Sequence, residues 1–117
     1  MITLTIRTAE EQRAINEAKQ EALRQMENMA IENTIEKIFE ACKAEIDKTL
    51  DNMATVRIYN KLLDKGLPTM TREECQKLIF APIETILTDA GYHVDISVYS
   101  ESWSRKSGKF ATIYILF

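Results

Sequence analysis

The segment between residues 99 and 109 combines aromatic rings with cations, and it contains the only tryptophan of the chain. Single-stranded nucleic acids are bound by rings that stack on bases and by cations that contact phosphates. The hairpin 99–109 is therefore a candidate interaction site, together with the start of the strand that follows it. Its candidate residues are Tyr99, Trp103, Arg105, Lys106, Lys109, Phe110 and Tyr114.

A second interpretation of this segment needs no ligand. In it, the strand that begins near Tyr92 continues to Ser104, Trp103 packs on the outer face of a sheet, and the cations lie in a solvated turn. We favour this interpretation because the chain has a formal net charge of −3, and three cations release few counterions on binding nucleic acid. Nucleic-acid binding is accordingly the alternative hypothesis.

His93 and Asp95 occupy alternate positions of a predicted strand and so share one face. Such a pair could hold two ligands of a metal site or orient an imidazole, but no third ligand is evident. Cys42 and Cys75 lie on apolar stripes of predicted helices, where we expect buried free thiols. The sequence has no glycine-rich loop, CxxC pair or nucleophile elbow. We therefore expect no catalytic residue, no metal and no cofactor, and a non-enzymatic protein.

These side chains must be positioned by a chain that is mostly helical. Residues 8–65 contain neither glycine nor proline and are rich in residues that favour helices. Thr8 and Glu11 match a capping box, so the first helix should begin near Ala9. A single helix over the whole span would be roughly 85 Å long. We expect a helical arm or hairpin at about 8–65, made of one long helix or of two to three helices, the last ending at Gly66.

The apolar residues of this span form two stripes, which lie roughly 150° apart on a helical wheel. In one interpretation the helix breaks near Asn33, which with Glu36 could form a cap. In the other the helix runs through, and each stripe meets a different neighbour, one of them in another copy of the chain. We prefer the break, although Asn33 and Thr34 are only mild helix breakers. The first stripe is Ile15, Ala18, Ala22, Met26 and Met29, and the second is Ile31, Ile35, Ile38, Phe39, Cys42, Ile46, Leu50 and Met53.

Two further elements lie at the start and in the middle of the chain. Ile2, Leu4 and Ile6 alternate with polar residues, a pattern that predicts an N-terminal strand. Residues 71–90 open with a capping box of Thr71 and Glu74 and repeat apolar residues at helical spacing. This core helix should be kinked at Pro82, with Phe80 turned outward.

The C-terminal quarter of the chain predicts a β-hairpin. Residues 92–99 alternate between apolar and polar, and residues 109–117 are apolar on both faces, with Phe110, Tyr114 and Leu116 on one of them. With the N-terminal strand, this gives a three-stranded, mainly antiparallel sheet packed on helices. The fold class is α+β, and residues 1–117 form a single domain.

Composition narrows the classes of protein further. The chain is 45% hydrophobic and 28% charged, as ordinary globular proteins are. It has no apolar run near the ~18 residues that a membrane-spanning helix needs, and its first residues lack the pattern of a signal peptide. We expect a cytoplasmic location and no membrane partner.

The leading hypothesis is a small protein-interaction module that self-associates as a homodimer or binds a protein partner. Its warrant is an excess of apolar surface pointing in more directions than one small domain can cover. The candidate self-association residues are Ile15, Ala22, Met26 and Met29 on the helix, with the outer sheet face as the other surface. A third hypothesis, suggested by short length and lack of motifs, is a phage- or mobile-element-encoded regulator or inhibitor of a host protein.

Overall fold

The computed structural model of this chain describes residues 2–98 and 108–117, with only the backbone described for Lys109. It has the predicted α+β architecture, in which helices pack on a three-stranded antiparallel sheet. The elements in chain order are α1 (Ala9–Lys48), β1 (Met53–Tyr59), a 3-10 turn (Asn60–Leu62), α2 (Arg72–Cys75), a π-helical turn (Gln76–Phe80), α3 (Ala81–Asp89), β2 (His93–Val98) and β3 (Lys109–Leu116).

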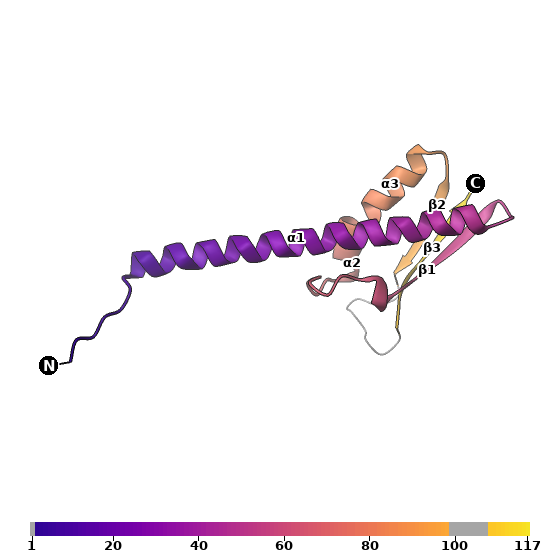
Figure 1. Cartoon of the computed structure of the whole chain (residues 1–117). Helices are drawn as coiled ribbons and strands as arrows, with labels where there is room; N and C mark the ends of the chain where they lie inside the picture. The colour runs from indigo at the N-terminus through magenta and orange to yellow at the C-terminus, as the bar shows by residue number, and fades with distance from the viewer. Residues whose placement is uncertain (1, 99–107) are drawn as a thin grey trace.

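Helix α1 is continuous over 40 residues, so the preferred break near Asn33 is wrong. It begins as predicted, because the Thr8 hydroxyl accepts a hydrogen bond from the Glu11 backbone N–H at 3.2 Å. Asn33 does not act as a cap, since its side-chain amide donates to the Asp64 carboxylate at 3.3 Å. The helix would be about 60 Å long at ~1.5 Å per residue, and the whole molecule measures 81 × 32 × 22 Å. Half of α1 therefore projects from the rest of the protein (Figure 1).

The sheet has the order β1-β3-β2, with both pairings antiparallel. β2 and β3 are the predicted hairpin strands. The first strand of the sheet is Met53–Tyr59, so the prediction of a helical segment that continues to residue 65 is wrong. The predicted N-terminal strand is wrong: residues 2–8 have no regular structure, and Ile2, Leu4 and Ile6 are between 85% and 93% exposed. They precede the projecting half of α1, so the sheet is out of their reach (Figure 1).

One face of the sheet carries the core. Its side chains pack against Ile38 and Cys42 of α1 and against Ile83 and Leu87 of α3. The buried residues on this face are Ala54, Val56 and Ile58 of β1, Ala111, Ile113 and Ile115 of β3, and Val98 of β2. The members of the second stripe that lie in α1 thus pack within the chain. Leu50 and Met53 lie beyond the end of α1 and are 101% and 49% exposed.

The helical segment before β2 begins with the predicted capping box. Thr71 accepts from the Glu74 backbone N–H, and the Glu74 carboxylate accepts from that of Thr71, both at 3.2 Å. The irregularity expected at Pro82 takes the form of a π-helical turn, Gln76–Phe80, directly before it. Phe80 does not turn outward, because it is 2% exposed and packs against Phe110 with ring centroids 5.7 Å apart.

Within the part of the chain that the structure describes, no helix combines the length and apolarity needed to cross a membrane.

Candidate interaction surface

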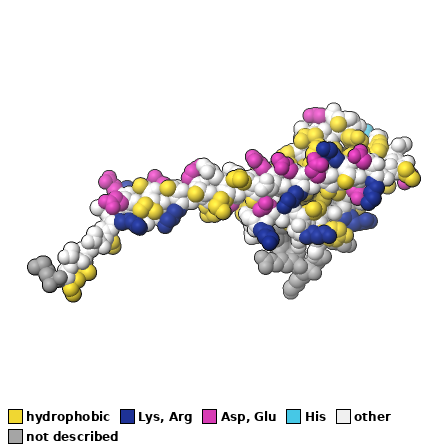
Figure 2. Space-filling view, viewed as in Figure 1, with side chains coloured by type: hydrophobic (Ala, Val, Ile, Leu, Met, Phe, Trp, Pro, Cys, Tyr) yellow, Lys and Arg dark blue, Asp and Glu magenta, His cyan; other side chains and the backbone are white. Residues whose placement is uncertain are grey.

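The projecting half of α1, residues 9–29, is the arm. None of its described residues is buried, and Ala30 is the first buried residue of the helix. Apolar side chains recur along the arm, as the space-filling view shows (Figure 2). Those of the first stripe are Ile15, Ala18, Ala22, Met26 and Met29, which we call the arm stripe.

The arm stripe points away from the side of α1 that meets the core. Residues Ala30, Thr34, Ile38 and Cys42 are buried at every fourth position, and this line lies nearly opposite the arm stripe on a helical wheel. Because α1 is continuous, the two sides cannot both turn towards the sheet. Met26 and Met29 accordingly remain 66% and 62% exposed.

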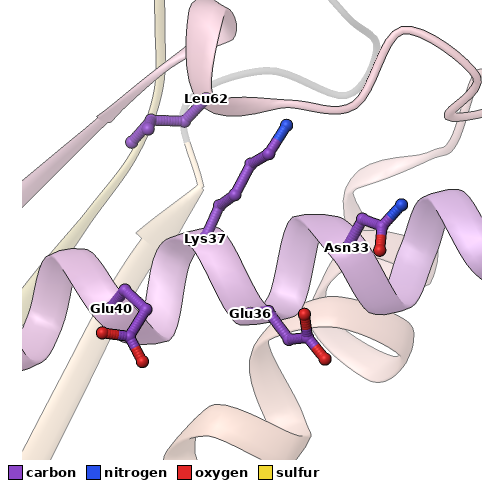
Figure 3. A pocket seen from close by; sticks show the side chains of 5 residues that line it. All are labelled: Asn33, Glu36, Lys37, Glu40 and Leu62. Atoms are coloured by element: carbon purple, nitrogen blue, oxygen red, sulfur yellow. The ribbon is translucent and has the colours of Figure 1, made fainter.

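A hollow adjoins the arm stripe where α1 reaches the globular part. It has a volume of about 380 Å³ and is lined by Asn33, Glu36, Lys37, Glu40 and Leu62. We call it the groove. Leu62 and Lys37 border the same opening, and Asn33, Glu36 and Glu40 lie along the helix (Figure 3). Asn33 follows Met29 by one helical turn, so the groove continues the line of the arm stripe.

Thr34 fixes the wall of the groove that contains Leu62. Its hydroxyl donates to the Ala30 carbonyl at 2.8 Å and accepts from the Asp64 backbone N–H at 3.1 Å, and the side chain is fully buried. The Asp64 carboxylate in turn accepts from the Gly66 N–H at 2.9 Å and from Asn33. These two hydrogen bonds, that of Gly66 first, lower the pKa of Asp64. The loop after β1 is thereby attached to the middle of α1.

Most of the predicted hairpin site falls outside the described residues: Tyr99, Trp103, Arg105 and Lys106 lie in the range 99–107, and the side chain of Lys109 is not described. Phe110 and Tyr114 are described, and they do not share a face as predicted. The pairing of β1 and β3 shifts register between Ile58 and Tyr59, which face Ala111 and Lys109. A bulge of this kind gives Phe110 no opposite residue and breaks the alternation. Phe110 therefore joins the core, while Tyr114 is 39% exposed.

The outer face of the sheet offers a smaller apolar surface than the arm. Met53, Leu116 and Tyr114 are exposed there, and Leu116 is paired with both Met53 and His93. Exposed polar residues interrupt this patch, among them His93, Asp95 and Arg57. Among the residues placed by the structure, no three His, Cys, Asp or Glu side chains are grouped to hold a metal ion.

Cys42 and Cys75 are free thiols in the core, as the sequence predicts. Burial raises the pKa of Cys42 to about 12. Burial, with a smaller effect of Glu74, raises that of Cys75 to about 11. Since the thiolate is the nucleophilic form, neither cysteine is an activated nucleophile.

Comparisons of this chain with protein-family models, with curated proteins and with solved structures found no match.

Proposed function

We propose that this protein is a non-enzymatic interaction module that self-associates as a homodimer through the arm stripe of α1. A single observation carries the proposal. The C-terminal half of a continuous helix buries one side against its own sheet, and the N-terminal half presents the opposite side as an exposed apolar stripe. The proposal includes a cytoplasmic location, which the two free thiols support.

The isolated arm has little reason to persist as helix. A helix in a protein takes most of its stability from packing of an apolar face, and the ~21 residues of the arm are marginal on propensity alone. The arm's own side-chain contacts are short-range and exposed: the Thr8 cap, a hydrogen bond from Gln12 to Asn16 at 3.0 Å, and a pair of Glu21 and Arg24 at 3.4 Å. Exposed pairs contribute about 0.2–1 kcal/mol. A second helix packed on the arm stripe would supply the packing that one chain lacks.

Sedimentation velocity and light scattering at micromolar concentration test the proposal. We expect a mass twice the 13.5 kDa of one chain. Met26→Glu with Met29→Glu should shift the protein to monomer, because it places charge within a packed apolar seam. The control is Gln20→Glu with Arg24→Gln, which adds one negative charge and removes one positive charge on the opposite side of the arm. It makes the same change of net charge and should leave the dimer intact.

A wild-type mass of one chain across this concentration range would refute the proposal. A dimer that tolerates the two substitutions at Met26 and Met29 would also refute it, and would move the contact to the outer sheet face around Tyr114 and Leu116. A monomer whose arm stripe binds an unrelated protein would favour the host-regulator hypothesis instead.

A further inference from the structure

The arm stripe reads the same in both directions. The steps between its members are 3, 4, 4 and 3 residues, with Ala22 at the centre. In an antiparallel pair of arms with Ala22 on the two-fold axis, Ile15 of one copy lies opposite Met29 of the other, and Ala18 opposite Met26. Ala18 then faces the longer Met26, which suits interdigitated packing, and only Ala22 meets its own copy. A parallel pair would place each of the five residues against its own copy, alanine against alanine and methionine against methionine.

The outward side of α1 beyond the arm also disfavours a parallel pair. This side continues the line of the arm stripe with Glu36, Glu40 and Asp47, all exposed. Lys43 offsets this charge in part through its ion pair with Glu40 at 3.2 Å. A parallel dimer of straight helices would set each acidic row against its own copy, and like charges at close range are unfavourable. In an antiparallel pair the two acidic rows lie at opposite ends of the paired arms.

The arms alone make a small contact. A helical segment of 21 residues has a projected footprint of roughly 30 Å by 10 Å, or ~300 Å² on each copy. A stable interface usually buries ~800 Å² per partner. Further contacts are needed, and the chain has an unused apolar segment directly before the arm: residues 2–8, which we call the tail, with Ile2, Leu4 and Ile6 exposed.

Antiparallel pairing brings this tail to the groove of the other copy. Ala9 precedes Ala22 by thirteen residues, and Ile35 follows it by thirteen. The tail of one copy therefore begins level with the turn of α1 that carries Glu36 on the other copy. Arg7, whose guanidinium donates to the Gln12 side chain at 3.4 Å, would arrive beside Glu36 and Glu40. Leu62 and the aliphatic part of Lys37 offer apolar surface to Ile6 and Leu4.

We propose that two copies pair through their arms in antiparallel orientation about Ala22, and that the tail of each copy occupies the groove of the other. This inference rests on the proposed dimer and adds its orientation and the place of the tail. It also gives a partner to the alternating sequence of residues 2–7, which pairs with no strand among the residues that the structure describes.

Cysteine cross-linking of the full-length protein tests the orientation. Under mild oxidation, Ala22→Cys should form a covalent dimer. Ile15→Cys and Met29→Cys should each stay uncross-linked alone and link to one another when mixed. Cys42 and Cys75 give little background because both are buried. A parallel dimer would also link Ala22→Cys, but it would link Ile15→Cys and Met29→Cys each to its own copy. Self-linking of Ile15→Cys in a protein that sediments as a dimer would therefore overturn this inference while leaving the proposed function standing.

A charge exchange tests the tail. Arg7→Glu should weaken dimerisation about tenfold, which is the size expected for the loss of two partly exposed ion pairs in a symmetric interface. Adding Glu36→Arg to the same chain should recover most of this loss, as a double-mutant cycle requires for groups in contact. Arg13→Glu, on the opposite side of the arm, is the matched control. Equal dissociation constants for Arg7→Glu and Arg13→Glu would overturn the placement of the tail.

Discussion

Thr34 is the residue through which α1 holds the loop that follows β1, and Thr34→Val isolates that contact. Valine keeps nearly the same shape in the fully buried site but has no hydroxyl. The Asp64 backbone N–H, now 3.1 Å from the hydroxyl oxygen, loses its acceptor. The Ala30 carbonyl loses the 2.8 Å bond from the hydroxyl and keeps its place in the helix.

The expected cost follows from these two changes. A buried donor left without an acceptor costs about 1–3 kcal/mol, and the lower end applies because the Asp64 N–H is only part-buried. Burying an apolar methyl in place of the hydroxyl offsets a few tenths of a kcal/mol of this cost, at ~25 cal/mol per Å² of apolar surface. We expect a loss of about 1 kcal/mol in the free energy of unfolding. For a domain of this size that corresponds to a melting temperature lower by about 4 °C.

Urea denaturation followed by far-UV circular dichroism, at one fixed protein concentration, measures the change. Thr85→Val is the matched control, since Thr85 makes the same type of bond to the carbonyl four residues before it, at 2.9 Å, but on an exposed helix surface. It should alter stability by less than about 0.5 kcal/mol. Amide hydrogen exchange should also quicken at Asp64 in Thr34→Val. Equal unfolding midpoints for the two variants would refute the assignment of Thr34 as the anchor of this loop.

Two further outcomes are expected. In the native protein neither Cys42 nor Cys75 should react with an aromatic disulfide reagent near pH 8, because burial raises the two pKa values to about 12 and about 11; both should react in denaturant, and prompt native-state labelling would contradict this. The Asp64 carboxyl has a lowered pKa, first through the Gly66 N–H and then through Asn33, so its stabilising effect is present above the unfolded value of about 3.9 and is lost as pH falls through the folded value. Asp64→Asn should therefore lower the urea midpoint at neutral pH, with the gap closing in acid, and a gap independent of pH would contradict the assigned hydrogen bonds.

Signals that are local in sequence predicted the fold well. The Thr8 cap and the capping box of Thr71 and Glu74 each depend on residues three positions apart, and both are present. The strand near residues 92–98 follows from alternation, and the strand near 109–116 follows from a run that is apolar on both faces. The two caps carry their own geometry, because the groups that make each bond lie within one turn of chain.

The errors arise where the outcome depends on distant partners. The tail alternates like a strand, but a strand needs a neighbour, and the projecting arm keeps the tail from the sheet. The lack of glycine and proline favours a helix at Met53–Tyr59, whereas in the structure this segment is a strand. Ala54, Val56 and Ile58 are buried there and alternate with the more exposed Met53, Thr55 and Arg57. The sequence predicts Phe110 and Tyr114 on one face of the last strand, because alternation of residues alone cannot reveal a bulge.

The candidate surface is likewise predictable from the sequence only in part. The arm stripe could be identified from helical periodicity, and the structure places it on the exposed side of α1. The groove could not, because Leu62 and Asn33 are brought together by the bond between Thr34 and Asp64, which lie thirty residues apart. No pattern in either segment signals the other.

Because α1 is unbroken, the number of residues between the arm and the core fixes the rotation of the arm relative to the sheet. With no hinge between Met29 and Ala30, one inserted residue would turn the arm by about 100° relative to the sheet and advance it by ~1.5 Å. The number of residues in the helix therefore sets the angle between anything bound to the arm and the globular end. Single-residue insertions there would change the mutual orientation of two assembled copies while leaving every apolar contact of each copy's own interior in place.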